Sequence, residues 1–249
     1  MKKILAMLLA SIMVLSLAAC GGNTTAPKAE QPDVKGEGVM TYAEYAAAAM
    51  DSEVVVETYV QAHQSWWDGK ITCYTQDKDG AYFIYNMACT EEDAAKLTQG
   101  TKIKVTGYKS EWSGEVEITE AKIEVLTDNT YVAAPLEATS LLGTDDLAKH
   151  QNEFAAFKGM TVEAMDDGES AFFYSWDGSG QEGTDSDLYF KVSKDGQTYT
   201  FVVEYYLCNE TTPVYEAVRN LKVGDTVDIE GFLYWYEGPQ THVTSVTVK

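Results

Sequence analysis

Tryptophan stands directly before an Asp-Gly pair at two places in this sequence. The two segments are "SWWDGK" at 65–70 and "YSWDGSG" at 174–180, and the chain holds five tryptophans in all. Indole is a large, flat and mostly apolar group with one N–H donor, so an exposed indole offers a surface on which a sugar ring can stack. The tryptophans are therefore the first residues to consider as ligand contacts, and the rest of the sequence must show which elements position them.

The chain is strongly acidic. It has 39 Asp and Glu residues against 18 Lys and Arg, its net charge is −21, and Arg219 is its only arginine. Such a surface repels polyanions, and one arginine gives little bidentate grip on phosphate. We therefore do not expect a nucleic-acid partner, whereas neutral and cationic ligands suit this charge.

The common motifs of enzymes and cofactor sites do not occur in the sequence. There is no nucleophile elbow, no phosphate-binding glycine loop, no zinc signature and no convincing Ser/His/Asp order. The three histidines, His63, His150 and His242, show no metal-ligand spacing. We expect a protein that is not an enzyme and that carries no cofactor.

An acidic loop at 166–187 is the one place where a cation could be considered. Hard cations prefer oxygen ligands, and the candidate ligands here are Asp177, Glu182, Asp185 and Asp187. The order of these residues does not fit an EF-hand loop, which needs its glycine at the sixth position. A solvated loop without a metal is the favoured interpretation.

The sequence contains an internal repeat. "KLTQGTKIKVTGY" at 96–108 matches "NLKVGDTVDIEGF" at 220–232, which pairs Gly100 with Gly224 and Gly107 with Gly231. Upstream, Cys89 matches Cys208, and both a Lys-Asp-Gly and a Trp-Asp-Gly segment recur in the same order. A preserved order of anchors with variable spacing indicates two copies of one module.

Each copy shows the same sequence of elements. In the first copy, strands are expected at 53–62, 70–76, 81–88, 101–108 and 116–125, with a helix opened by Thr90 between the third and fourth. A short helix opened by a Thr41–Glu44 capping box precedes the first strand. In the second copy, Thr212 and Pro213 start the equivalent inserted helix.

Five strands with a helix between the third and fourth resemble the OB-fold. The fold class is therefore expected to be all-β with short helices, in the form of two tandem five-stranded OB-fold-like barrels. The expected domains are 39–125 and 139–249, joined by a linker at 126–138. The alternative is a pair of small α+β domains with open sheets.

The OB-fold resemblance implies where the tryptophans lie. In OB-folds the ligand rests on strands two and three, between the loop after strand one and the loop after strand four. The residues that map to these two loops are Trp66, Trp67 and Trp112 in the first copy and Trp176, Trp235 and Tyr236 in the second. They are predicted to wall one groove per module. For Trp67 and Trp176, the repeated pair, the favoured interpretation is that they fold back as structural lids over the barrel ends, and Trp66, Trp112 and Trp235 are the better binding candidates.

The first hairpin predicts which residues face the groove. If Asp79-Gly80 is a two-residue turn, one face carries Tyr74, Phe83, Tyr85, Met87 and Cys89 and the other carries Cys73, Thr75, Tyr82, Ile84 and Asn86. The first face matches Phe190, Tyr199, Phe201 and Val203 of the second copy and is predicted to be the core. Tyr82 and Ile84 then lie on the ligand-facing side, and Cys73 and Cys89 point in opposite directions.

The N-terminal residues resemble a bacterial lipoprotein signal. Lys2 and Lys3 precede an apolar stretch that ends in "LAAC" at Cys20, the layout of a lipobox. The resemblance implies a signal peptide at 1–19, lipidation of Cys20, and a protein held at the outer side of a bacterial membrane, at the cell surface. The polar segment 20–38 is expected to be a flexible tether. Three cysteines then remain, an odd number that does not fit a disulfide scaffold.

These observations favour a membrane-anchored binding module whose ligand is a glycan or a peptide. A scaffold that holds another envelope protein is the alternative from a different class, in which the loop aromatics are interface anchors. A nucleic-acid-binding OB-fold protein is a further alternative, supported by the fold resemblance and opposed by the charge.

Overall fold

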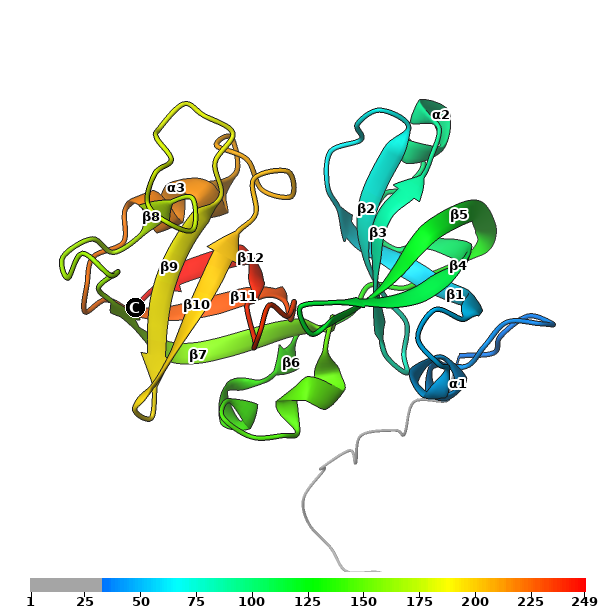
Figure 1. The fold of residues 1–249 in the computed structure, drawn as a ribbon, viewed down its shortest axis with the longest axis horizontal. Coiled ribbons are helices and arrows are strands. Elements are labelled where there is room, and N and C mark those ends of the chain that lie inside the picture. Colours follow the sequence, from blue (N-terminus) through cyan, green and yellow to red (C-terminus); the bar gives the residue numbers. More distant parts are fainter. Residues whose placement is uncertain (1–32) are drawn as a thin grey trace, which may run out of the picture. The chain divides into compact units, whose positions relative to one another are not determined.

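A computed structural model describes residues 33–249 of the chain. The predicted signal peptide at 1–19, Cys20 and most of the predicted tether lie outside the described residues. Within residues 33–249 two β-barrels follow one another along the chain (Figure 1), and both belong to one compact unit. No helix in this range is long and apolar enough to cross a membrane.

The first barrel is closed and has five strands. They are β1 (Glu53–His63), β2 (Lys70–Gln76), β3 (Ala81–Ala88), β4 (Thr101–Trp112) and β5 (Glu115–Thr130). The order around the barrel is β1-β2-β3-β5-β4, with β1 paired to β4 and with β3 and β5 running parallel. This closed order confirms the OB-fold-like topology and excludes the alternative of open sheets.

Two short helices cover the first barrel. The α1 helix (Tyr42–Ala47) begins at Thr41, where both hydrogen bonds of the expected capping box to Glu44 are present. Its last carbonyls accept hydrogen bonds from the buried Lys109 ammonium, at 2.8–3.1 Å. The α2 helix (Glu91–Ala94) lies between β3 and β4 and is capped by Thr90, as predicted.

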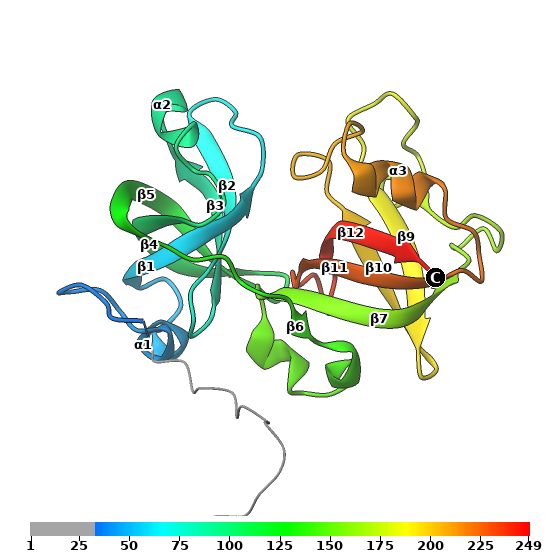
Figure 2. The ribbon, with the colours of Figure 1, turned by 180° about the vertical axis from the view of Figure 1, so that it is seen from behind.

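The second barrel repeats this topology. Its elements are β6 (Leu136–Glu137), η1 (Thr139–Leu141), η2 (Leu147–His150), β7 (Phe154–Glu163), β8 (Phe173–Tyr174), β9 (Leu188–Lys194), β10 (Gln197–Val203), α3 (Pro213–Arg219), β11 (Thr226–Phe232) and β12 (His242–Val248). The five strands β7, β9, β10, β11 and β12 pair as β1 to β5 do, including the parallel pair β10–β12 and the closure between β7 and β9. Figure 2 shows the α3 helix over the second barrel from behind.

The paired glycines of the repeat have the same structural roles in both barrels. Gly100 and Gly224 both have left-handed backbone, with φ of 88° and 92°, in the turn before β4 and β11. Gly107 and Gly231 both lie against a neighbouring strand, where an added Cβ would come within 2.7 Å and 2.4 Å of a backbone carbonyl oxygen. Both pairs therefore exclude larger side chains for steric reasons, and these shared constraints explain why the repeat is detectable.

Aromatic and polar contacts join the two barrels. Tyr74 and Phe83 of the first barrel pack with Phe232 and Tyr234 of the second in one buried cluster. The segment 126–138, expected as a linker, is partly within the sheets, because β5 continues to Thr130 and β6 pairs with β7. The side chain of Gln76 also accepts a hydrogen bond from the Phe154 backbone N–H at 2.8 Å.

The prediction that Tyr82 and Ile84 face a ligand is wrong. Both side chains are fully buried in the core of the first barrel. The hairpin turns around Lys78-Asp79, since Asp77 pairs with Gly80 and its carboxylate accepts both the Asp79 and the Gly80 N–H. This displaces the turn by one residue and the pairing by two, so residues 73–85 keep the predicted division into two faces. The error lies in which face was assigned to the core, because the face of Tyr74 and Phe83 packs against the second barrel.

The bulge at Asn86 corrects the expectation for the cysteines, because the pairing shifts between Ile71 and Cys73 and brings Met87 and Cys89 to the core face. Cys73 and Cys89 both lie in the core of the first barrel and not on opposite sides. They are free thiols, as is Cys208 in the second barrel. Tyr74 and Phe83, expected in the core, lie instead against the second barrel.

Candidate ligand-binding cleft

Buried aromatic rings from both barrels pack together at the junction of the barrels. The Tyr74 hydroxyl and His242 Nδ1 are 2.6 Å apart, and the Tyr234 ring stacks on the His242 ring with centroids 4.1 Å apart. Burial lowers the pKa of His242 to about 3, so the imidazole is neutral near pH 7. A neutral ring between two tyrosines holds the barrels together without an unpaired charge.

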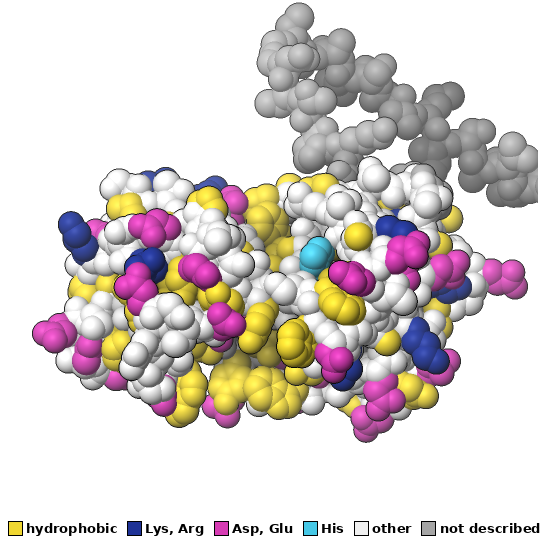
Figure 3. Space-filling view, turned by 90° about the horizontal axis from the view of Figure 1, so that it is seen from above, with side chains coloured by type: hydrophobic (Ala, Val, Ile, Leu, Met, Phe, Trp, Pro, Cys, Tyr) yellow, Lys and Arg dark blue, Asp and Glu magenta, His cyan; other side chains and the backbone are white. Residues whose placement is uncertain are grey.

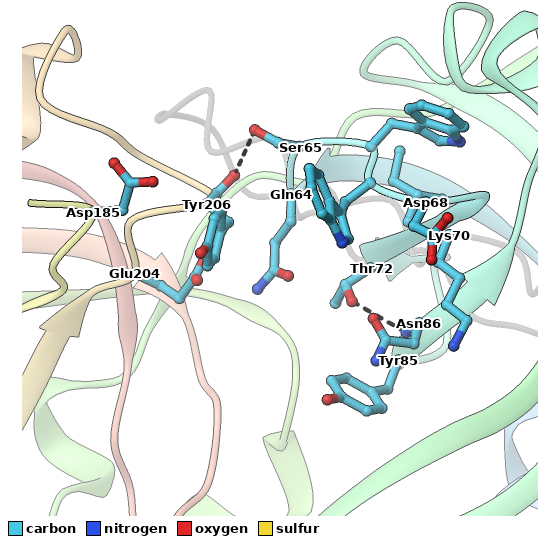
Figure 4. Close-up of a pocket in the computed structure, with 13 residues that line it drawn as sticks. Gln64, Ser65, Asp68, Lys70, Thr72, Tyr85, Asn86, Asp185, Glu204 and Tyr206 are labelled. Carbon is cyan, nitrogen blue, oxygen red and sulfur yellow. Dashed lines mark hydrogen bonds between the residues drawn. The ribbon is translucent and has the colours of Figure 1, made fainter.

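The first cleft lies where the β1–β2 loop of the first barrel meets the loop after β10. Figure 4 shows its labelled polar and aromatic side chains, with Asp185, Glu204 and Tyr206 on one side and the residues of the first barrel on the other. The cleft has a volume of about 720 Å³. The backbone N–H of Ser65 donates to the Tyr206 carbonyl oxygen at 2.9 Å, which ties the two loops together.

A tight turn projects the first tryptophan pair toward this cleft. Trp67 and Lys70 exchange both backbone hydrogen bonds, and Asp68 and Gly69 between them have φ of 47° and 76°. Two positive φ values are the mark of a type I′ turn, for which Asp-Gly is a preferred pair. The turn leaves Trp67 81% exposed, while Trp66 is 37% exposed and is fixed by an Nε1–H bond to the Cys89 carbonyl oxygen at 2.8 Å.

Four aromatic rings and several neutral polar groups therefore line the first cleft. The rings belong to Trp66, Trp67, Tyr85 and Tyr206, and the polar groups to Gln64, Ser65, Thr72 and Asn86. The Asn86 backbone, which has φ of 46°, donates its N–H to Thr72 Oγ1 at 3.1 Å. This bond fixes the local bulge beside the Asn86 side chain, and it is drawn as a dashed line in Figure 4.

A second cleft of about 400 Å³ adjoins the first. The rings that line it are Trp112, Trp176, Tyr189, Tyr234 and Tyr236. Trp112 comes from the β4–β5 turn of the first barrel and packs on Tyr236 of the second, with centroids 5.2 Å apart. Glu204 lines both clefts and marks the boundary between them.

The structure regroups the predicted tryptophan sites. Trp66 and Trp112, expected in one groove of the first module, lie in different clefts, and each cleft takes residues from both barrels. Trp67 and Trp176 are 81% and 76% exposed, so the favoured interpretation that they are structural lids is wrong. Trp235 is partly buried against the second core and lines neither cleft.

Acidic side chains stand between and beside the rings. Burial and the nearby Asp187 carboxylate raise the pKa of Glu204 to about 7. Burial also raises the pKa of Asp187, whose Oδ1 accepts the Tyr205 N–H at 2.8 Å. Both carboxylates are thus held in place at a site where their negative charge is poorly solvated.

The four candidate cation ligands do not converge. Glu182 pairs with Arg219, Asp177 accepts the Ser179 N–H at 3.0 Å, and Asp187 is turned toward the Tyr205 backbone. Across residues 33–249 no group of three or more His, Cys, Asp or Glu side chains is placed to hold a metal ion.

Several contributors to the clefts were not predicted from the sequence, among them Tyr189 and Tyr234 of the second cleft. Tyr85 was assigned to the core but is 46% exposed at the first cleft, and Tyr206 and Glu204 received no role. Tyr206 and Glu204 follow β10 in a loop that has no counterpart in the OB-fold groove, so only the packing of the two barrels brings them to a site. Figure 3 shows hydrophobic side chains gathered in the hollow between the barrels, with acidic side chains nearby.

No family model matches the chain, and no curated protein does. Several solved structures are similar to it over most of its length. They include the HINa domain of Ifi202 in complex with 20-base-pair double-stranded DNA (13% identity, 80% of this chain and 98% of that chain, TM-score 0.34), a murine DNA-binding protein bound to double-stranded DNA (9%, 78%, 94%, 0.32) and a replication protein A heterotrimer bound to single-stranded DNA (10%, 79%, 49%, 0.30). Because these TM-scores and identities are low, the fold of this chain is assigned from its own strand pairing.

Proposed function

We propose that this chain is a non-catalytic binding protein whose first cleft holds an oligosaccharide. The observation that carries the proposal is the joint presence, in that cleft, of four aromatic rings and a set of amide and hydroxyl groups. Sugar rings present apolar faces that stack on aromatic side chains and hydroxyl edges that bond to amides. Both kinds of contact are available side by side.

The charge of the first cleft also suits an uncharged ligand. Its charged lining side chains are Asp68, Asp185 and Glu204 against the single Lys70. An anionic ligand would be repelled by the Asp68 and Asp185 carboxylates and by Glu204 when it is ionised, whereas a neutral ligand meets no such repulsion.

The N-terminal sequence supports a proposal for the site of action. "LAAC" at the end of an apolar stretch supports cleavage before Cys20 and attachment of lipid to its thiol. We propose that the two barrels are held in this way at the outer side of a bacterial membrane, where surface and wall glycans are accessible ligands.

Single-stranded nucleic acid is the second candidate ligand of the first cleft. Bases also stack on exposed aromatic rings, and Trp67 and Tyr206 are free to do so. Binding of this kind also needs a positive groove that follows the phosphates. The low number of basic side chains in the cleft places this candidate behind the oligosaccharide.

The proposal is tested by titrating the protein with soluble neutral tetrasaccharides and with a single-stranded oligonucleotide. Calorimetry and tryptophan fluorescence report binding. Trp67→Ala and Tyr206→Ala should each abolish or weaken oligosaccharide binding at least about tenfold, the size expected for loss of one stacking ring. Tyr108→Ala is the matched control, because Tyr108 is 41% exposed and lines neither cleft.

Two results would contradict the proposal. One is the absence of heat and of fluorescence change with every tetrasaccharide, while the circular dichroism spectrum shows a folded protein. The other is oligonucleotide binding that weakens in Trp67→Ala and survives physiological salt, which would assign the cleft to nucleic acid. Capture of a folded protein partner that both variants lose would favour the scaffold alternative.

A further inference from the structure

We propose that the second cleft is a separate binding site for an organic ammonium cation, a quaternary or primary amine head group. The site is an aromatic enclosure with two carboxylates at its wall. Its ligand chemistry differs from that of the first cleft, so the proposal stands independently of the oligosaccharide.

Aromatic faces from both barrels meet at this cleft. Trp112 comes from the first barrel, and Trp176, Tyr189, Tyr234 and Tyr236 come from the second. A cation is attracted to the negative face of an aromatic ring, most strongly to that of tryptophan. Trp112 and Trp176 are 54% and 76% exposed, so both rings remain accessible to a ligand, although Trp112 also packs on Tyr236.

The charge of the second cleft selects the sign of the ligand. Asp187 and Glu204 line it, and no Lys or Arg is among its lining residues in the described part of the chain. Neither carboxylate takes part in any of the ion pairs found for residues 33–249. A cation seated between the rings would supply the missing counter-charge to two carboxylates that burial keeps poorly solvated, and would offset the repulsion between them.

The carboxylates are preorganised for this role. Asp187 Oδ1 accepts the Tyr205 N–H at 2.8 Å, and Glu204 Oε2 accepts the Leu207 N–H at 2.7 Å. The Tyr189 hydroxyl lies 3.4 Å from Asp187 Oδ2. A ligand therefore meets fixed negative groups and does not have to order them.

The test uses choline and its neutral isostere 3,3-dimethyl-1-butanol, which has the same shape without the charge. Choline should quench tryptophan fluorescence in a saturable way, and the isostere should bind at least about tenfold more weakly, because it lacks the cation–π and ionic attraction. Trp176→Ala and Asp187→Asn should each weaken choline binding by a similar factor. Asn keeps the oxygen that accepts the Tyr205 N–H, which protects the fold.

Trp67→Ala separates this inference from the proposed function. Trp67 lines only the first cleft, so the variant should lose oligosaccharide binding and keep its choline affinity. Failure of the folded protein to bind choline would overturn the inference. Equal binding of the two probes would also overturn it, since the site would then be merely apolar, and so would choline binding that Trp176→Ala leaves unchanged.

Discussion

Glu115 gives the most quantitative prediction about the junction of the barrels. Its side chain is fully buried, its Oε2 accepts the Trp235 backbone N–H at 2.9 Å, and burial raises its pKa to about 9. In the unfolded chain a glutamate has a pKa of about 4.3. Between these two values the folded state therefore binds one proton that the unfolded state releases.

The sign of the pH dependence follows from this difference. The free energy of unfolding falls as the pH rises from about 4.5 to about 9, by about 1.4 kcal/mol per pH unit from this one group. Glu115→Gln removes the titration and retains an oxygen for the Trp235 N–H. We compare the free energy of unfolding of the variant with that of the original protein at each pH. The difference should shift by about 3 kcal/mol in favour of the variant when the pH is raised from about 5 to about 7.5.

Urea unfolding of both proteins at the two pH values measures this increase. Glu124→Gln, on an exposed position of the same strand, controls for the loss of one negative charge. Curves of stability against pH that run parallel for Glu115→Gln and the original protein would refute the argument, because they would show that Glu115 ionises alike in the folded and unfolded states.

Three further substitutions test other contacts by urea unfolding. Tyr74→Phe removes the hydroxyl paired with buried His242 and should cost about 1–3 kcal/mol, so an unchanged stability would show that the contact is unimportant. Lys109→Met removes the ammonium that donates to the Tyr45, Ala46 and Ala48 carbonyls at the end of α1 and should also cost about 1–3 kcal/mol, whereas the exposed Lys122→Met should have little effect; equal effects would contradict the capping role. Gly231→Ala places a Cβ against the β12 backbone and should cost more than about 2 kcal/mol, and a stable variant would show that the strands can separate there.

The fold was predictable because its signals are local and occur twice. Capping residues such as Thr41 and Thr90 mark helix starts wherever they stand, and their hydrogen bonds form within one turn. The glycine pairs, which demand left-handed backbone or close strand approach, repeat at matching positions. Strand order then follows from the OB-fold resemblance, and the structure shows it in both barrels.

The faces of the first hairpin were not predictable from pattern alone. Tyr82 and Ile84 on one face and Tyr74 and Phe83 on the other are all large, apolar and buried. One face fills the barrel and the other meets the second barrel, so hydrophobicity does not tell them apart. The Asp77 side chain draws the turn back by one residue, but the resulting two-residue shift in pairing leaves each side chain on its predicted face and does not decide which face is the core.

The clefts were predictable only in part. The Asp68-Gly69 pair indicates a tight turn directly after Trp67, and that turn is present. Glu204 and Tyr206 lie far along the chain from these residues and reach them only because the barrels pack together. A sequence-based analysis that treats each module separately assigns such residues no role.

The most direct test of the central claim is an NMR titration that observes the indole Nε1–H signals of the five tryptophans while a neutral tetrasaccharide is added. An oligosaccharide in the first cleft should shift the signals of Trp66 and Trp67, which line it, and leave that of Trp235 in place. If every indole signal stays unchanged for all tetrasaccharides tested, or if only Trp235 responds, the first cleft is not an oligosaccharide-binding site.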